Sequence, residues 1–583
     1  MNVLMSVAVL GAVGIRQWTE AATVVFLFSL SELLEALSVA RARKAIGEVL
    51  TITPETATLI DSRGKHSEIA TESIVIGSLI LVKSGERIPM DGVVKNGTSY
   101  VNQAALTGES APVEKKVGDN VFAGTINESS VLEILVSSSS ENSKVAQIIR
   151  MVEEAQGQKA PSERFVDSFA KIYTPAVFVL AILTLAVPPL AFHQEWSVWF
   201  YKALVLLVVA CPCALVISTP VSIVSALTAL ARKGVLVKGG AFLEILGKVR
   251  AIAVDKTGTI TEGTPTVHQV ILIGDATEQN VVQVAASVEK LSSHPLAVAV
   301  VRYSEGLSIP LKPATDFKNI LGKGAEAKIE GHEYFLGNHR FAHELGVCTP
   351  ELEKQLAGLE EKSLSVIVVG HRPHSGCKGE VLGILAVGDV IRKDAKQAVQ
   401  ELRDAGIESM IMLSGDNQRT ATAIASSAGI SEAIGDLLPE GKVSEMKRLV
   451  QKYGVVAMIG DGINDAPALA EASVGIAMGG IGTDTAIETA DVALMRDDLK
   501  QVVVAIKQGR RALSVIRFNI GFAILLKAAF LVLTFLGFAN LWLAVGADTG
   551  ASLLVIFNSL RLLRIKAYTF VPHNSQVYVF SNC

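Results

Sequence analysis

Long apolar stretches alternate with long polar intervals along this chain of 583 residues. Six stretches approach the length needed to cross a bilayer core of about 30 Å; they are roughly residues 1–15, 20–40, 172–192, 198–227, 518–536 and 541–560. The first has no basic start and no small-residue cleavage site, so we interpret it as a membrane span rather than a signal peptide. The pattern predicts a polytopic α-helical membrane protein.

Two polar intervals, about 42–171 and 228–513, separate these stretches. Basic residues stand beside the span ends that open onto both intervals, among them Arg41, Arg232 and Arg510, whereas the other loops are a few residues long. By the positive-inside rule, both intervals face the cytoplasm. We therefore expect a small membrane bundle that carries two cytoplasmic units.

Composition narrows the class of protein. Half of the residues are hydrophobic and the mean hydropathy is +0.42, yet 19% are charged, which suits a membrane protein with large water-exposed parts. The net charge of −4 gives no indication of a nucleic-acid partner. Five cysteines in a chain of this length do not make a disulfide framework, and they favour a reducing environment for the soluble parts.

The larger interval contains buried strand patterns that end in carboxylates. The segment "AIAV" leads into Asp255, "SMIML" leads into Ser414-Gly415-Asp416, and "VVAMIG" leads into Asp461. A helical pattern follows each strand, which predicts a doubly wound parallel α/β sheet with these carboxylates converging at one edge. Clustered carboxylates repel one another unless a cation is present, so the pattern implies Mg²⁺.

Such a site suits phosphoryl transfer. We expect Asp255 to be the nucleophile, because a carboxylate can form an aspartyl phosphate. Further groups would hold the phosphate or Mg²⁺: Lys256, Thr257, Thr259 and Lys442 for phosphate, and Asp255, Thr257, Asp461 and Asp465 for Mg²⁺. A lone Asp after a strand would more often be a helix N-cap, but three in these contexts disfavour that alternative.

The motifs "DKTGT", "SGDN" and "GDGINDAP" resemble those of the P-type ATPases, whose core belongs to the haloacid-dehalogenase-like fold. The resemblance covers almost the whole chain, in the same order. Soluble phosphatases with that core usually carry a second Asp two residues after the nucleophile, where this chain has Thr257. This difference favours a pump, in which the acyl phosphate persists long enough to drive a conformational step.

The resemblance also implies two further cytoplasmic parts. "ALTGESAPV", which contains Thr107, Gly108 and Glu109, is similar to the actuator loop, and the resemblance implies that Glu109 positions a water molecule against the aspartyl phosphate. Alternating polarity around this loop predicts a small β-rich domain. An insertion, roughly 266–378, resembles an α+β nucleotide-binding domain; its ATP-contacting residues would be Glu289, His294, Pro295, Gly322 and Gly324, with Asp389 and Arg392 at the return hinge.

The insertion also contains His371, His374 and Cys377 at a spacing that could suit zinc. No fourth ligand is evident and the segment is rich in Gly and Pro, so we interpret it as a solvent-exposed loop.

The apolar run "VVACPCALVISTP" contains a second chemical motif. Pro212 removes a backbone donor and kinks the helix, and Cys211 and Cys213 beside it offer two thiolates for a soft metal ion. Cysteine is also a common small buried residue, but two that flank a mid-membrane proline favour metal binding. The motif resembles the CPC of heavy-metal-transporting P-type ATPases.

Two charges in the last spans distinguish zinc from copper. Lys527 and Asp548 are the sole ionisable residues between 518 and 560, and their default interpretation is functional, with each other as partner. Asp548 added to two thiolates suits a divalent ion, and Lys527 would supply the counter-charge once the ion leaves. The surroundings resemble the zinc/cadmium/lead-exporting branch, in which Glu32 would receive the departing ion; Glu32 at a helix end is the alternative.

The sequence therefore predicts an ATP-driven exporter of Zn²⁺, Cd²⁺ or Pb²⁺. The alternatives are a copper-transporting P-type ATPase and a truncated, non-transporting metal-binding membrane protein. Branch members usually have two further spans, and often a metal-binding domain, before the position that matches Met1. The expected partners are the lipid bilayer, ATP, the metal ions and a cytoplasmic metal donor, with the chain acting as a monomer.

The expected domains follow the chain in order: spans 1–41, an actuator domain 42–165, spans 166–230, a phosphorylation domain in two parts 231–265 and 379–513, the nucleotide-binding insertion 266–378, spans 514–564 and a tail 565–583.

Overall fold

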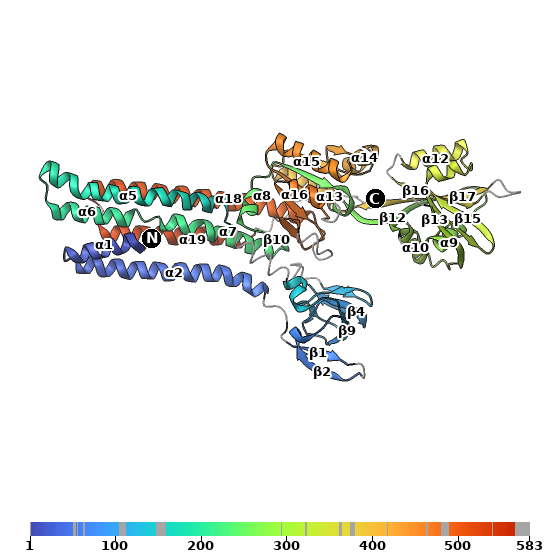
Figure 1. Ribbon diagram of the computed structural model, residues 1–583, viewed down its shortest axis with the longest axis horizontal. Coiled ribbons are helices and arrows are strands. Elements are labelled where there is room, and N and C mark those ends of the chain that lie inside the picture. The colour runs from blue at the N-terminus through green and yellow to red at the C-terminus, as the bar shows by residue number, and fades with distance from the viewer. Residues whose placement is uncertain are drawn as a thin grey trace, which may run out of the picture.

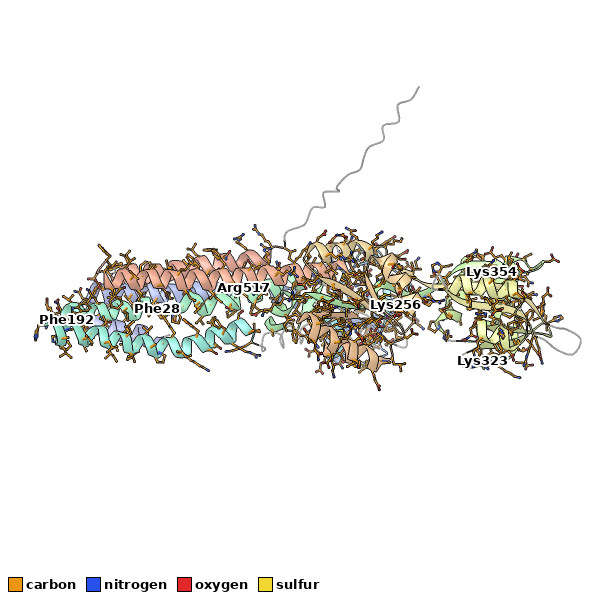
Figure 2. The ribbon with its side chains drawn as sticks, turned by 90° about the horizontal axis from the view of Figure 1, so that it is seen from above. Phe28, Phe192, Lys256, Lys323, Lys354 and Arg517 are labelled. Atoms are coloured by element: carbon orange, nitrogen blue, oxygen red, sulfur yellow. A yellow bond between two sulfur atoms is a disulfide. The ribbon has the colours of Figure 1, made fainter. Side chains whose placement is uncertain are left out.

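The computed structural model is elongated, with a helical bundle at one end, a seven-stranded domain in the middle, a distal six-stranded domain at the other end and a lateral β domain beside the middle (Figure 1). Figure 2 places Phe192 at the tip of the bundle, Lys256 in the seven-stranded domain, and Lys323 and Lys354 in the distal domain. The structure describes residues 2–50, 54, 56–61, 64–103, 112–146, 159–292, 294–320, 323–360, 364–372, 379–416, 418–461, 465–479, 489–538 and 540–565.

The bundle consists of long apolar helices: α1 (Asn2–Gly14), α2 (Trp18–Leu50), α5 (Pro161–Phe192), α6 (Trp196–Val209), α7 (Cys213–Ala231), α18 (Lys500–Phe535) and α19 (Leu541–Leu560). Among the described residues, four helical stretches are long and apolar enough to cross a bilayer: Pro161–Phe192, Trp196–Ala231, Lys500–Phe535 and Leu541–Leu563. The chain is a multi-pass membrane protein, as expected.

Helix bounds differ from the predicted spans. Within the described part of the chain, α1 has 13 residues and the apolar stretch of α2 covers Trp18–Leu30, so neither meets the length of a full span. Conversely, α2 continues to Leu50, α5 begins at Pro161 and α18 begins at Lys500, each beyond the predicted boundary. Hydropathy detects only the apolar segment of a helix. The backbone hydrogen bonds of the helix do not depend on apolar side chains, so the same helix extends beyond this segment into the water-exposed part.

A break between α6 and α7 lies inside the bundle. Pro212 has φ −80° and ψ 36° and precedes Cys213, the first residue of α7. Proline has no backbone N–H, so it cannot donate to the preceding turn and the helix is interrupted here. The break puts the CPC segment at the junction of two nearly collinear helices (Figure 1).

The lateral β domain contains two sheets. Strands in the six-stranded sheet have the order β2-β1-β3-β9-β4-β7, and β6-β5-β8 form a second sheet. Alternating residues of β3 and β9, such as Ile80, Val82, Leu132 and Ile134, build a common core. The strand bounds are β1 (Thr56–Ile60), β2 (His66–Ala70), β3 (Leu79–Val82), β4 (Gly92–Asn96), β5 (Ser99–Asn102), β6 (Val113–Lys115), β7 (Asn120–Val121), β8 (Ile126–Asn127) and β9 (Leu132–Val136).

The seven-stranded domain has the strand order β10-β22-β21-β20-β11-β18-β19. The interior strand β11 (Ala251–Asp255) is buried throughout and pairs in parallel with β18 (Ser409–Leu413) and β20 (Val456–Gly460). The outer strands are β10 (Val235–Val237), β19 (Glu432–Ile434), β21 (Val474–Ala477) and β22 (Val492–Leu494), and the helices are α8 (Gly240–Leu246), α13 (Ala395–Asp404), α14 (Gln418–Ala428), α15 (Pro439–Tyr453) and α16 (Ala466–Glu471).

The core of this domain extends into the membrane helices. Ile223 and Leu230 of α7 and Val502 and Ile506 of α18 belong to the same buried cluster as Ile252 of β11. Both helices therefore connect the sheet to the bundle without an intervening loop, so a shift at one end is transmitted along a stiff element.

The distal domain is an antiparallel sheet of order β12-β17-β16-β15-β14-β13. Its long strands β12 (Thr261–Leu272) and β17 (Glu380–Ile391) reach back to the seven-stranded domain, so the sheet exceeds the predicted insertion 266–378 at both ends. The remaining elements are β13 (Ala314–Ile320), β14 (Gly324–Ile329), β15 (His332–Gly337), β16 (Ser365–His371), α9 (Glu278–Glu289), α10 (Pro295–Gly306), α11 (His339–Glu344) and α12 (Pro350–Glu360). Helices α9 and α10 cover one face of the sheet, and α11 and α12 cover the other.

Candidate phosphorylation and metal-binding sites

The candidate nucleophile lies at the carboxyl edge of the central sheet. Asp255 is the last residue of β11 and is 6% exposed. Ser414 directly follows β18 and Asp461 directly follows β20, so the parallel register brings the three predicted segments to one edge. A carboxylate there is surrounded by protein on most sides and open towards the edge.

Lys442 joins two of the predicted carboxylates. Its Nζ lies 2.5 Å from Asp255 Oδ1 and 2.7 Å from Asp465 Oδ1. Lys442 occupies the first turn of α15, which begins at Pro439, where proline is favoured. Burial, followed by the neighbouring Asp465 carboxylate, raises the pKa of Asp255 to about 6, while the Lys442 ammonium opposes this rise.

The loop after Asp255 separates the remaining predicted residues. The Thr257 amide donates to Asp255 Oδ2 at 2.9 Å and its side chain is exposed, so Thr257 is open to a ligand at this edge. Thr259 is fully buried, and its hydroxyl oxygen has no partner among the described residues. Thr257 and Thr259 thus differ strongly in their access to a phosphate.

Lys256 pairs with a carboxylate of the neighbouring strand. Its Nζ lies 2.6 Å from Asp416 Oδ2, and the Asp416 amide in turn donates to Ser414 Oγ at 3.1 Å. Gly415 approaches the Leu437 carbonyl: a Cβ there would lie 3.4 Å from that oxygen. The ion pair connects the loop after β11 to the loop after β18 and occupies one donor of the ammonium that was expected to hold phosphate.

Residues of the return hinge also contact this loop, a relationship that sequence spacing did not reveal. Arg392 donates to the carbonyl oxygens of Gly258 at 3.0 Å and Thr259 at 3.1 Å. The Thr261 hydroxyl donates to Asp389 Oδ2, and Asp389 Oδ1 is buried without a partner among the described residues. Both ends of the distal insertion are therefore tied to the loop that follows the candidate nucleophile.

The edge of the sheet fits a divalent cation. Asp465 is 1% exposed, and its Oδ2 has no hydrogen-bond partner among the residues that the structure describes. Asp461 approaches the loop as well, because a Cβ on Gly258 would lie 3.6 Å from Asp461 Cβ. Oxygen ligands of this kind are the ones that Mg²⁺ prefers in proteins.

The predicted nucleotide residues are distributed over the distal domain. Glu289 ends α9 half-buried, and burial raises the pKa of its carboxyl to about 7. His294 is exposed and caps α10, since its Nδ1 accepts from the Leu296 amide at 3.2 Å, and Pro295 is the first helical residue. Capping is the structural alternative for a lone histidine, and here it accounts for the orientation of the ring.

Gly324 is required by packing within the sheet. Its φ is +151°, and a Cβ at this position would lie 2.0 Å from the Leu336 carbonyl oxygen of the neighbouring strand. The close backbone approach expected at this glycine is therefore made to β15.

Three residues of the CPC segment and α19 come together in the bundle. The sulfur atoms of Cys211 and Cys213 lie within 4.8 Å of each other, and one carboxylate oxygen of Asp548 lies within the same distance of both. Cys211 and Cys213 are 1% and 7% exposed, and the structure joins their sulfur atoms as a disulfide, whereas the sequence predicts two thiolates. Reduction of this pair would supply two soft ligands beside a hard one.

Lys527 of α18 lies at the same point. Its Nζ is 2.9 Å from Asp548 Oδ1 and 3.1 Å from the Val209 carbonyl oxygen, and it also donates to the Cys211 carbonyl oxygen. These two carbonyls belong to the turn that Pro212 interrupts. A cavity of about 10 Å³ beside Lys527 and Asp548 is at the lower limit for one water molecule.

The other predicted residues are outside these clusters. Glu32 of α2 has an exposed side chain and is not among the residues that approach Asp548. Thr107, Gly108, Glu109 and Gly322 lie outside the described residues, as do His374 and Cys377. His371 ends β16 with its ring 4.3 Å from that of Tyr334, which is a packing contact within the sheet.

A helical membrane bundle continues into a doubly wound domain whose strand β11 ends at Asp255. This is the architecture expected of a membrane ATPase of the P type. Comparisons with known proteins agree. The family model for haloacid dehalogenase-like hydrolases matches residues 249–473, and that for the P-type ATPase actuator domain matches residues 51–153.

Relatives over the whole length identify the branch. The chain is 46% identical over 571 residues to a probable cadmium-transporting ATPase of Staphylococcus aureus (strain MRSA252), covering 97% of this chain and 78% of that protein. It is 42% identical over 567 residues to a zinc/cadmium/lead-transporting P-type ATPase of Escherichia coli (strain K12), covering 97% and 75%. The chain belongs to the heavy-metal-transporting P-type ATPases.

A solved structure supports the same assignment. The crystal structure of a zinc-transporting PIB-type ATPase in the E2.Pi state matches with a TM-score of 0.65 and 42% identity, over 96% of this chain and 90% of that chain. The predicted family and fold class are confirmed, including the β-rich actuator domain and the haloacid-dehalogenase-like domain.

Proposed function

We propose that this chain exports Zn²⁺ and Cd²⁺ from the cytoplasm, driven by transient phosphorylation of Asp255. The observation that supports this most directly is the meeting of Cys211, Cys213 and Asp548 within 4.8 Å inside the bundle. Two thiolates and a carboxylate carry three negative charges, which suits a divalent soft ion better than Cu⁺. Lys527 replaces the ion as the partner of Asp548 after release.

The proposed chemistry takes place at the edge of the central sheet. An oxygen of Asp255 attacks the γ-phosphorus of ATP, the bond to the β-phosphate oxygen breaks, and ADP leaves. Lys442 balances the charge of Asp255 and Asp465 before attack and that of the phosphoryl group after it. Water positioned by Glu109 then hydrolyses the acyl phosphate to inorganic phosphate.

Mg²⁺ is the cofactor that this site would take. Asp255, Asp461 and Asp465 offer the oxygen ligands, with Thr257 beside them, and the bound ion would neutralise charge on the transferred group. The nucleotide is expected on the distal domain near Glu289 and Gly324, from which the hinge strands β12 and β17 lead back to Asp255.

A single copy of the chain contributes every residue of this cycle, so we propose a monomeric pump. Its ion would come from a cytoplasmic metal donor and pass Glu32 on release. Differential binding of the ion by two conformations is what the cycle requires.

The test is ATPase activity of the purified chain with its cysteines reduced, titrated with Zn²⁺, Cd²⁺, Pb²⁺ and Cu⁺ in the presence of Mg²⁺. We expect stimulation by the divalent soft ions that is lost in Cys211→Ala and Asp548→Ala, and no phosphoenzyme in Asp255→Asn. Stimulation by Cu⁺ alone, or a metal-dependent phosphoenzyme in Asp255→Asn, would contradict the proposal.

A further inference from the structure

The helices α7 and α19 pack against each other, and both carry buried hydroxyl groups on the cytoplasmic side of the candidate metal-binding residues. Ser218 and Ser225 of α7 are 0% exposed and Ser552 of α19 is 4% exposed. None of their three hydroxyl oxygens has a hydrogen-bond partner among the residues that the structure describes. Buried polar groups are normally paired, so three in one region require an explanation.

Helical spacing places these groups in two rows. Ser218, Ser222 and Ser225 are four and three residues apart, which puts them on one face of α7. Asp548, Ser552 and Ser559 are four and seven residues apart, which puts them on one face of α19. The row on α19 therefore begins at the carboxylate of the metal site.

A contact shows that the two rows face each other. Ser222 Oγ and Ser559 Oγ are 2.8 Å apart, and Asn519 of α18 donates to Ser559 Oγ at 3.1 Å. Asn558 extends this network by donating to Asn519 Oδ1 at 2.8 Å. The rows thus continue for about three turns of helix, or about 16 Å, from the metal site.

The cytoplasmic end of this region lies at the junction with the seven-stranded domain. Ile223 and Ala226, on either side of Ser225 in sequence, belong to the buried cluster that contains β11. Figure 1 shows α7 and α19 side by side up to the point where β10 begins. Movement of that domain during the ATP cycle would act directly on the helix that carries Ser218, Ser222 and Ser225.

We propose that these hydroxyls line the route by which the divalent ion passes from the cytoplasmic end of the bundle to Cys211, Cys213 and Asp548. A partly hydrated divalent ion needs oxygen ligands along an otherwise apolar path, and a serine hydroxyl can replace a water molecule in this role. Because the hydroxyl is uncharged, it does not bind the ion so tightly that the ion is trapped. The two rows are packed together in this structure, so the route opens when α7 and α19 separate. This inference rests on the proposed transport function.

If the Ser218 and Ser225 hydroxyls served only packing, their removal would have a different effect from the one expected for groups that line an ion route. Removing an unpaired buried hydroxyl relieves a desolvation cost, so Ser218→Ala and Ser225→Ala would stabilise the protein and leave transport unchanged. A route residue instead affects the rate at which the ion reaches its site, without changing the affinity at equilibrium.

The experiment measures the rate of phosphoenzyme formation from ATP and Mg²⁺ after addition of Zn²⁺ below saturation, in the full chain with reduced cysteines. We expect phosphoenzyme formation in the Ser218→Ala/Ser225→Ala variant to be about tenfold slower. A loss of this size corresponds to one stabilising interaction removed from the transition state for ion entry. Equilibrium Zn²⁺ binding stays as in the wild type, and Ser218→Thr/Ser225→Thr restores the rate.

Two controls separate the possible causes. Thr228→Ala removes a hydroxyl from the same helix that donates to its own Val224 carbonyl at 2.7 Å, and it should leave the rate unchanged. Phosphorylation by inorganic phosphate without Zn²⁺ reports an intact catalytic domain in every variant. Ser552→Ala tests the second row independently and should also slow the reaction.

A wild-type rate in the double variant and in Ser552→Ala, accompanied by a higher melting temperature, would overturn the inference. Failure of the wild-type chain itself to form a Zn²⁺-dependent phosphoenzyme would instead overturn the proposed function.

Discussion

The Lys527 ammonium lies 3.1 Å from the carbonyl oxygen of Val209, at the end of α6. Pro212 deprives this turn of a backbone donor, and Lys527 supplies donors from another helix to Val209 and Cys211. The same ammonium pairs with Asp548 at 2.9 Å. One side chain of α18 therefore connects the interrupted helix to the carboxylate of the proposed metal site, which gives Lys527 a structural role beside its expected role as counter-charge.

Substitution of Lys527 by methionine should destabilise the protein. Loss of one partner leaves the Asp548 carboxylate buried and unpaired at a cost of about 3–5 kcal/mol. We expect a lower melting temperature for Lys527→Met in metal-free detergent solution. The double variant Lys527→Met/Asp548→Asn should recover much of the loss, because it removes the uncompensated charge; a double variant less stable than the single one would refute this explanation.

Phosphorylation should depend on the ionisation of Asp255. Since burial raises the pKa of this carboxyl to about 6, the carboxylate, which is the form proposed to attack ATP, is the minor form at pH 5 and the major form at pH 7. We expect the single-turnover rate of phosphorylation by ATP to rise over this range, before saturating. Rates that stay level from pH 5 to pH 7 would show that bound ions hold the pKa of Asp255 at its ordinary value.

The Asp255 carboxyl should also make the stability of the folded chain depend on pH, but stability should fall with rising pH whereas the phosphorylation rate should rise. Its pKa is higher in the folded chain than the ordinary 3.8, so the folded state binds more protons between pH 4 and pH 6 and loses stability as the pH rises through this range. Asp255→Asn should reduce this fall, as measured by thermal unfolding without Mg²⁺. An unchanged pH dependence in this variant would assign the fall to other groups.

Glu289 offers a second, independent pH effect in the distal domain. Burial raises the pKa of its carboxyl from 4.5 to about 7, which corresponds to at most about 3 kcal/mol of destabilisation once the group is ionised. Glu289→Gln should therefore increase stability at pH 8 and have little effect at pH 5. Thermal unfolding at both pH values measures this, and Glu305→Gln, at an exposed position on α10, should show no such difference.

Gly324 tests whether a glycine near the expected nucleotide site serves packing. A Cβ there would lie 2.0 Å from the Leu336 carbonyl oxygen, so Gly324→Ala should force β14 and β15 apart and lower the melting temperature. Gly358→Ala is the matched control, because that helical glycine has open space around it and alanine should stabilise α12 by about 1 kcal/mol. If Gly324→Ala lost ATP binding at unchanged stability, the glycine would serve the nucleotide directly.

Local pattern predicts the chemistry that adjacent residues in the chain specify. The apolar run before Asp255 predicts a buried strand with a carboxylate at its end, because a strand covered on both faces of a parallel sheet is apolar at nearly every position. The CPC segment likewise predicts a break with two sulfur ligands, because the effect of proline on a helix is local. Lys527 and Asp548 stand out because charges are rare in lipid-spanning segments.

Contacts between residues distant in sequence depended on the tertiary structure. Lys256 was expected to hold phosphate, but its closest carboxylate is Asp416, 160 positions later. The capping role of His294 depends on where α10 begins, and the constraint on Gly324 depends on β15 lying against it.

Sequence by itself determined the family, and it predicted the order of the domains' motifs and the candidate residues for the chemistry, because these follow from residue type and short-range periodicity. Only the tertiary structure decided how far the helices extend into the cytoplasmic domain and which cation neutralises which carboxylate. It also decided that buried hydroxyls of α7 and α19, which have no partner among the described residues, adjoin the proposed metal site. The reason is physical: pairing and desolvation depend on the distance between atoms from separate elements, which packing alone sets.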